Sequence, residues 1–238
     1  MSVLAMQVAI LAGGLATRLG ELTRNQPKST LNIRGKTFLE YQLELLRRGG
    51  IKDIVLCVGH MGEQIERHCG NGKKYGLNIK YSAEDKPLST AGALKKAESL
   101  LNDTFFTMYG DSYLFLDFGL IMNYYQSQNK LALMTVYKNY DRYGISNTEV
   151  EGNLVRQFSK KEKTEDMVYI EYGVNIFQKE ALKMVPKNQF CPLDDLFHRL
   201  IEMEELLAFE VKDRFYEVGS PEGLKEFEEY IREENDTF

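Results

Sequence analysis

Short, continuous apolar runs recur along the chain, separated by segments whose apolar residues follow helical spacing. Uninterrupted runs of this length are typical of strands buried on both faces of a parallel sheet. The predicted strands cover residues 8–12, 53–59, 104–109, 131–137 and 169–177. A further strand is predicted over 77–81, where apolar and polar residues alternate, and a hairpin over 144–158 turns at Glu151-Gly152-Asn153. One predicted helix follows Thr37, and others cover 61–69, 90–101, 117–129, 193–206 and 221–235. This alternation predicts an α/β fold, an open, mostly parallel sheet with helices on both faces.

The helix after Thr37 carries its own start and stop signals. Thr37 and Glu40 have the spacing of a capping box, in which each side chain accepts a hydrogen bond from the other residue's backbone N–H. Arg47 and Arg48 place cations in the last turn, and Gly49 follows as a stop. The boundaries of this helix are therefore predicted from local sequence alone.

The overall charge argues against whole classes of function. The formal net charge is −5 and the pI is near 5.4, whereas a nucleic-acid-binding protein would present a basic face. No apolar run approaches the ~20 residues of a membrane span, and the apolar N-terminus lacks the basic segment of a signal peptide. We predict no nucleic-acid and no membrane partner, and the sequence is compatible with a homodimer.

The cysteines and histidines are few and scattered. Cys57, Cys69 and Cys191 form no C-x-x-C pair, which indicates reduced, buried thiols and a cytoplasmic location. The three histidines also lack the spacing of a zinc site. We therefore expect neither disulfides nor a zinc centre.

The stretch VAILAGGLATRLGELTRNQPKSTLNIRGK, residues 8–36, carries the candidate chemistry. An apolar strand ends at Gly13-Gly14, where exposed backbone amides allow a bulky anion to approach. Thr17, Arg18 and Lys28 follow with a hydroxyl and two cations, and Arg24 adds a third cation. The dinucleotide fingerprint G-x-G-x-x-G and the Walker A loop are both absent here. The stretch is therefore predicted to bind a polyphosphate in another way.

The string L-A-G-G-x-x-T-R-L, followed by L-T and P-K, resembles the signature of the sugar-1-phosphate nucleotidylyltransferases. Ala16 replaces a usual glycine and Ser29 a usual proline, but neither change removes a charge. The resemblance implies a Rossmann-like open mixed, mainly parallel sheet of the nucleotide-diphospho-sugar transferase type. It also implies one domain over 1–238, with a nucleotide-binding half to about residue 115, a sugar-phosphate half over 116–220 and a C-terminal helix over 221–238.

Two further motifs suggest a magnesium site. Gly110-Asp111 follows the strand 104–109, and a carboxylate at such a strand end suits Mg²⁺, which takes one or two carboxylates together with phosphate oxygens and water. Phe215-Tyr216-Glu217-Val218-Gly219 resembles the family's closing motif, whose aspartate is the second metal ligand. The resemblance therefore implies Mg²⁺ held by Asp111 and Glu217.

The segment Glu84 to Ala93 resembles the family's base-binding P-L-G-T-A-G-A, with Ser89 in place of the first glycine. The Glu84 carboxylate accepts hydrogen bonds only, and guanine offers two adjacent N–H donors, so GTP is favoured over other nucleotides. The resemblance implies that the nucleotide contacts Leu11, Ala12, Gly13, Gly14, Thr17, Glu84, Ser89 and Thr90.

The sugar-side motifs depart from the family pattern. Tyr143-Gly144 matches its Y-G-V, and Glu171 to Asn175 stand at N-A-G-V-Y, with Glu171 in place of an asparagine. Lys161 matches the phosphate-binding lysine of F-x-E-K-P, but the preceding glutamate is Lys160 here. The resemblance implies substrate binding by Tyr143, Gly144, Lys161, Glu171 and Asn175, while the departures leave the sugar open.

The implied reaction joins an NTP to a heptose or hexose 1-phosphate and releases pyrophosphate, for surface-glycan biosynthesis. The expected catalytic residues are Arg18 on the β/γ-phosphates, Lys28 on the α-phosphate and Asp111 on the metal. Taken as a whole, the sequence most resembles the short guanylyltransferases that act on heptose or mannose 1-phosphates. The alternatives are a uridylyl- or cytidylyltransferase for another sugar, or a catalytically silent nucleotide-sugar-binding regulatory subunit.

Overall fold

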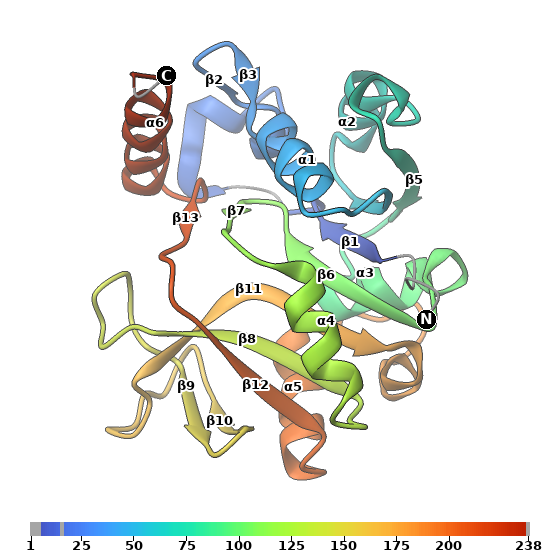
Figure 1. Ribbon diagram of the computed structural model, residues 1–238. Helices are drawn as coiled ribbons and strands as arrows, with labels where there is room; N and C mark the ends of the chain where they lie inside the picture. Colours follow the sequence, from blue (N-terminus) through green and yellow to red (C-terminus); the bar gives the residue numbers. More distant parts are fainter. Residues whose placement is uncertain (1–5, 15–16, 237–238) are drawn as a thin grey trace.

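The computed structural model describes residues 6–14 and 17–236 and is built on one nine-stranded sheet (Figure 1). The strand order is β5-β4-β1-β6-β11-β8-β12-β10-β9. These strands are β1 (Gln7–Leu11), β4 (Asp53–Val58), β5 (Asn78–Ala83), β6 (Thr104–Tyr109), β8 (Ala132–Lys138), β9 (Thr148–Glu151), β10 (Leu154–Phe158), β11 (Tyr169–Gln178) and β12 (Leu206–Val211). Two small pairs complete the set: β2 (Asn32–Ile33) with β3 (Lys36–Thr37), and β7 (Ser112–Tyr113) with β13 (Tyr216–Glu217).

The sheet has a parallel part and a mixed part. Strands β5, β4, β1 and β6 run parallel, so their carboxyl ends meet at one edge. β11 is antiparallel to both of its neighbours, β6 and β8, whereas β12 runs parallel to β8. The predicted open mixed α/β sheet is confirmed. Ligands of such sheets bind beyond the carboxyl ends of the parallel strands, which locates the candidate site.

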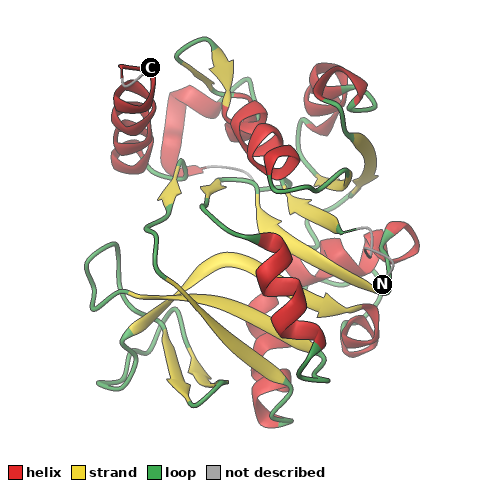
Figure 2. Ribbon diagram, in the orientation of Figure 1, coloured by secondary structure: helices red, strands yellow, loops and turns green. Residues whose placement is uncertain are grey.

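Helices cover both faces of the sheet, as predicted (Figure 2). One face packs against α1 (Phe38–Arg48), α2 (Gly62–Cys69) and α4 (Phe118–Gln126), and the other against α3 (Ser89–Ala97) and α5 (Leu193–Glu202). The capping box of α1 is present, with Thr37 Oγ1 accepting from Glu40 N and the Glu40 carboxylate accepting from Thr37 N.

The C-terminal helix α6 (Pro221–Asp236) lies against a separate aromatic cluster. Phe227 is fully buried and packs edge-on against Phe38 at 5.2 Å and Tyr41 at 5.5 Å between ring centroids. Figure 1 shows β13 beside β7 just before this helix. Docking of α6 therefore holds β13 next to β7, which follows β6 in the sequence.

Some predicted boundaries are wrong. The helix predicted over 193–206 ends at Glu202, because Glu204 adopts a left-handed φ of 56° and Leu206–Val211 forms β12, which the sequence analysis missed. The helix predicted over 117–129 ends at Gln126. The hairpin predicted from residue 144 begins only at Thr148, because residues 139–147 form a loop held by Asn139 and Ser146 side chains. Within the described ranges, no helix is both long and apolar enough to span a membrane.

Candidate active site

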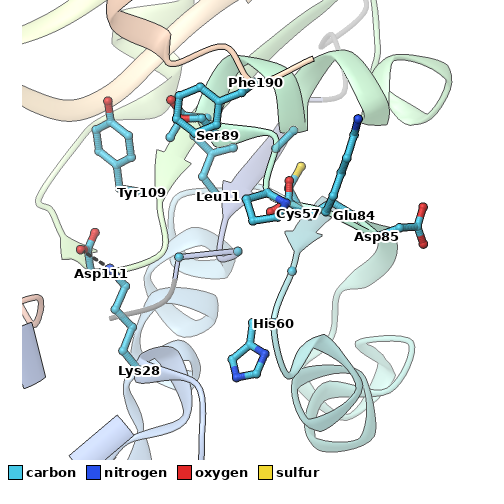
Figure 3. A pocket seen from close by; sticks show the side chains of 17 residues that line it. Leu11, Lys28, Cys57, His60, Glu84, Asp85, Ser89, Tyr109, Asp111 and Phe190 are labelled. Carbon is cyan, nitrogen blue, oxygen red and sulfur yellow. Dashed lines mark hydrogen bonds and ion pairs between the residues drawn. The ribbon is translucent and has the colours of Figure 1, made fainter. Parts of the chain in front are cut away.

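A cavity of about 520 Å³ opens at the carboxyl edge of the parallel strands (Figure 3). Its walls come from the ends of β1, β4 and β6, from the start of α3, and from two more distant segments. The residues lining it include Leu11, Gly13 and Gly14 at the end of β1, Cys57, Gly59 and His60 at the end of β4, Glu84 to Pro87 before α3, Ser89 and Thr90 in α3, Tyr109 and Asp111 at the end of β6, and also Lys28 and Phe190. Most of the predicted nucleotide contacts therefore line one cavity.

The glycines at the strand ends allow the backbones to approach closely. A Cβ on Gly59 would lie 2.9 Å from the Gly13 carbonyl oxygen, and a Cβ on Gly110 would lie 2.8 Å from the Leu11 carbonyl oxygen. Ala12 is buried beneath this loop, where its N–H donates to the Cys57 carbonyl at 2.8 Å. Ala12 thus supports the loop from below. Thr17 lies outside the described side chains.

Lys28 and Asp111 meet at one end of the cavity although their positions in the sequence differ by 83. Lys28 Nζ lies 2.5 Å from Asp111 Oδ2, and the pair is visible at the lower left of Figure 3. The two side chains are only 17% and 20% exposed, so water screens the pair less than it screens a surface ion pair. Two of the three predicted catalytic residues are therefore brought into direct contact.

Arg18, Asp111 and Glu217 converge on Gly219. A Cβ on Gly219 would lie 2.6 Å from Glu217 Oε2, 2.7 Å from Arg18 Nη2 and 3.0 Å from Asp111 Oδ2. The pairing of β13 with β7 produces this arrangement, together with the hydrogen bond from Val218 N to the Asp111 carbonyl at 2.9 Å. The Glu217 carboxylate also accepts from Gly219 N at 2.6 Å and from the Ser220 hydroxyl.

The donor set at this point suits a hard divalent cation that shares its coordination with substrate. Among the described residues no group of three or more acidic, histidine or cysteine side chains is placed to hold a metal alone. Two neighbouring carboxylates nevertheless match Mg²⁺, which usually keeps several waters and binds through one or two carboxylates plus phosphate oxygens. Asp111 and Glu217 therefore fit the role expected of them, provided that a phosphate completes the shell.

Gly219→Ala is expected to lower turnover by about a hundredfold without unfolding the protein, because a misplacement of about 1 Å is enough for such a loss. The φ of Gly219 lies outside the left-handed region, so alanine suits the backbone, but its methyl group would displace Arg18, Asp111 and Glu217. Initial rates and melting temperatures check this. Gly119→Ala, whose methyl group would meet only Asp117 at 3.3 Å, is the matched control and should behave like wild type.

Glu84 is held beneath the glycine loop. Its Oε2 accepts from Leu88 N at 3.1 Å, and its Oε1 lies close to Gly13 and Gly59. Burial raises the pKa of the Glu84 carboxyl, against the opposing effects of the Leu88 hydrogen bond and the charge of Lys96. Burial, and then the Glu84 charge, also raise the pKa of the neighbouring Cys57 thiol to about 12, so this thiol is neutral.

Ser89 and Thr90 shape the start of α3. Ser89 has a φ of 60°, a conformation that glycine adopts more readily, which explains why the family motif has glycine there. Thr90 Oγ1 accepts from Leu193 N at 2.7 Å and so ties α3 to α5. Both residues line the cavity, as their predicted role requires.

A buried polar network adjoins the cavity at Tyr109. The Glu171 carboxylate accepts from Tyr109 OH at 3.1 Å and from Asn175 Nδ2 at 3.0 Å. Burial raises the pKa of the Glu171 carboxyl, although the Lys160 charge opposes this effect. Asn175 is only 1% exposed, so it acts on the site through Glu171.

Lys160 belongs to this network. Its neighbour Lys161 makes no contact with the network among the described residues. Lys160 Nζ pairs with Asp194 at 3.0 Å and lies 5.8 Å from the centre of the Tyr109 ring. Burial lowers the pKa of the Lys160 ammonium, but the charges of Glu171 and Asp194 outweigh this effect and raise it. Lys161 is exposed, and its N–H donates to Ser159 Oγ. The structure thus places the Lys160 ammonium near Glu171, while the predicted binding of a sugar phosphate by Lys161 stays a prediction.

The loop with Tyr143 and Gly144 reaches Glu171 through the Asn147 side chain. Asn147 in this loop accepts from Glu171 N at 2.9 Å, and the Gly144 carbonyl accepts from Asn139 Nδ2 at 2.7 Å. The Arg214 guanidinium lies 4.2 Å from the Tyr143 ring centre and 4.4 Å from that of Tyr216. The sequence analysis missed Arg214, since no local signal distinguishes it from a solvated surface cation.

Comparison with known protein families identifies the family of this chain. The model of the nucleotidyl transferase family, described as "Nucleotidyl transferase", matches residues 7–234. The chain belongs to the nucleotidyl transferase family. The predicted resemblance to the sugar-1-phosphate nucleotidylyltransferases is confirmed.

The similar proteins use different nucleotides. The D-glycero-alpha-D-manno-heptose 1-phosphate guanylyltransferase of Campylobacter jejuni is 29% identical over 93% of this chain and 98% of its own. The UTP–glucose-1-phosphate uridylyltransferase of Synechocystis is 31% identical over 83% of this chain. The structure of HddC from Yersinia pseudotuberculosis complexed with GMP-PN superposes with a TM-score of 0.78, at 25% identity over 95% of this chain and 99% of that one.

The relatives differ in length. The chain spans 55% of the Synechocystis enzyme and 62% of the mannose-1-phosphate guanylyltransferase catalytic subunit beta of Xenopus tropicalis, to which it is 28% identical. It matches the Campylobacter enzyme over almost the whole of both chains.

Proposed function

We propose that this protein transfers a nucleotidyl group from an NTP to a sugar 1-phosphate and releases pyrophosphate. The observation that carries the proposal is the convergence of four charged residues on Asp111 and its surroundings. Lys28 and Asp111 line one end of a cavity formed by glycine-rich strand ends, and Arg18 and Glu217 meet Asp111 around Gly219. Cations and carboxylates in this arrangement suit phosphoryl chemistry, in which catalysis consists mainly of positioning and of neutralising developing charge.

Different residues contact different phosphates of the two substrates. The backbone amides at Gly13-Gly14 and the Arg18 guanidinium receive the β- and γ-phosphates, while Lys28 reaches the α-phosphate and the attacking oxygen. The sugar phosphate is largely a dianion near neutral pH, because its second pKa is about 6. Its oxygen can attack without a general base. The protein's task is to hold two mutually repelling anions in line.

Asp111 and Glu217 are the residues that would hold Mg²⁺. When bound, the ion would supply positive charge that offsets the charge developing on the leaving pyrophosphate. In the absence of a cation, Lys28 partly neutralises Asp111, which keeps the two carboxylates close together despite their repulsion.

The first test is direct. Purified protein with Mg²⁺, an NTP and a panel of hexose and heptose 1-phosphates should release one pyrophosphate per nucleotide sugar formed. A protein that binds nucleotide but releases no pyrophosphate with any acceptor would instead be a silent regulatory subunit. The intact set of Arg18, Lys28 and Asp111 favours the enzyme.

GTP is the proposed nucleotide, with a heptose or mannose 1-phosphate as acceptor for glycan assembly. Glu84 supports this choice, because Oε2 is occupied by Leu88 N while Oε1 faces the cavity loop and can accept from the guanine edge. The Campylobacter relative and the GMP-PN complex of HddC are guanine-nucleotide proteins of matching length. UTP and CTP remain the alternatives, given the uridylyltransferase among the relatives.

Glu84→Gln is expected to reduce the preference for GTP over ATP and UTP. If the glutamine oxygen keeps the Leu88 hydrogen bond, its NH₂ group faces the guanine donors and cannot accept from them. The measurement is kcat/KM for each NTP with one acceptor, with Glu66→Gln on the exposed face of α2 as the matched control. Equal use of GTP and ATP by the wild type would contradict the assignment.

A further inference from the structure

Phe190 is an exposed aromatic residue at the candidate cavity, and no motif in the sequence pointed to it. Its side chain is 69% exposed, and of the large apolar side chains left exposed in the described ranges it is the one that lines this cavity. Figure 3 shows the ring beside Ser89 and above Leu11, on the side of the cavity opposite Lys28. An exposed phenyl ring at a cavity wall offers a flat apolar surface to a ligand.

The backbone around Phe190 is fixed against the predicted base-binding segment. Cys191 N donates to the Leu88 carbonyl at 2.9 Å, and Gly92 N donates to the Cys191 carbonyl at 2.9 Å. A Cβ on Gly92 would lie 2.8 Å from the Gln189 carbonyl oxygen, so glycine is needed there for this close approach. The ring therefore stands on a rigid support although its side chain is exposed.

The same residue positions both Phe190 and Glu84. Leu88 uses its N–H to hold the Glu84 carboxylate and its carbonyl to hold Cys191. Leu88 thus positions two groups at one wall of the cavity. The Glu84 carboxylate can accept hydrogen bonds from the edge of a base, and the Phe190 ring can lie against the face of a base. Hydrogen bonds to the edge and stacking on the face are the two usual contacts of a nucleobase.

We propose that Phe190 stacks on the base of the bound NTP, so that Glu84 selects the base and Phe190 supplies affinity for any base. The proposal rests on the proposed function for the existence of an NTP site. Stacking on an aromatic ring tolerates every base, because each has a π-face. Phe190 therefore acts on nucleotide affinity and leaves base selectivity to Glu84.

The decisive experiment uses the absence of tryptophan from this chain. Phe190→Trp introduces a single tryptophan that keeps the stacking surface and reports on it. GTP and UTP are each expected to quench its fluorescence saturably, whereas inorganic tripolyphosphate and mannose 1-phosphate are not. Met203→Trp, at an exposed position beyond the other end of α5, is the matched control and should show no saturable quenching.

Steady-state kinetics give an independent readout. Phe190→Leu keeps apolar bulk without the ring, and Phe190→Ala removes both, so each is expected to raise KM for the NTP by about tenfold or more. KM for the sugar 1-phosphate and the ratio of GTP to UTP use should stay near wild-type values. Melting temperatures near the wild-type value would show that both variants fold.

Three results would overturn the proposal: quenching of the Phe190→Trp variant by mannose 1-phosphate instead of by nucleotide, a rise in KM confined to the sugar 1-phosphate, or an unchanged NTP KM in Phe190→Ala. Failure of the proposed function is a different result, since it means that the wild type releases no pyrophosphate with any substrate pair. The fluorescence experiment needs only nucleotide binding and no turnover. It therefore tests the stacking whether or not the wild type releases pyrophosphate.

Discussion

Lys28→Met is expected to lower turnover by about a hundredfold to a thousandfold while the fold survives, a loss typical of removing one preorganised charge at a transition state. Methionine keeps most of the lysine stem but cannot pair with Asp111 or with the transferring phosphate. The Asp111 carboxylate would also lose its neutralising partner, which increases its repulsion with Glu217 and with the phosphates.

Single-turnover rates at saturating NTP and acceptor measure this effect apart from binding, and circular dichroism checks the fold. Lys73→Met, at an exposed position before β5, serves as the matched control because it removes a lysine charge away from the cavity. Near-normal turnover in Lys28→Met would show that the 2.5 Å pair with Asp111 is structural only.

Asp111→Asn is the second substitution with a large expected effect, and it should abolish measurable turnover. Asparagine has nearly the same shape but no charge, so the proposed ion would keep one carboxylate in place of two. Glu217→Gln should be milder, because the amide oxygen can still accept from Gly219 N or the Ser220 hydroxyl and preserve the turn.

Thermal shift distinguishes a metal ligand from a structural carboxylate. In the wild type, Mg²⁺ with NTP should raise the melting temperature more than either alone, because a ligand that binds only the folded state stabilises it. This joint stabilisation should vanish in Asp111→Asn, and Glu217→Gln should need more Mg²⁺ for the same rate. Unchanged joint stabilisation in Asp111→Asn would count against a metal at this position.

Several features were decided by local sequence. The runs that became β1, β4 and β6 are mostly apolar, and they are buried along almost their whole length, as strands covered on both faces of a sheet are. The capping box at Thr37 depends on residues three apart, and the structure shows both of its hydrogen bonds. The candidate phosphate loop was also recognisable, because strand, glycine turn and cations follow one another within one stretch of chain.

Other features depended on contacts between distant segments. Leu206–Val211 was assigned in part to a helix, yet it pairs with β8 along its whole length, and this strand pairing exists only in the folded sheet. The cation beside Glu171 is Lys160, one residue before the motif lysine, because the Lys160 side chain meets Asp194 at the start of α5. Phe190 carried no local signal at all.

The sequence by itself determined which residues are candidates for binding phosphate and metal, because charge, hydroxyl groups and glycine flexibility are properties of single residues and short spacings. Only the tertiary structure decided that Lys28 meets Asp111, that Glu217 reaches Asp111 through the pairing of β13 with β7, and that Phe190 stands on Leu88 beside Glu84. Such contacts join residues tens to more than a hundred positions apart. They form when sheet pairing and helix docking offset the entropy cost of closing those long loops. Local sequence patterns do not predict such contacts.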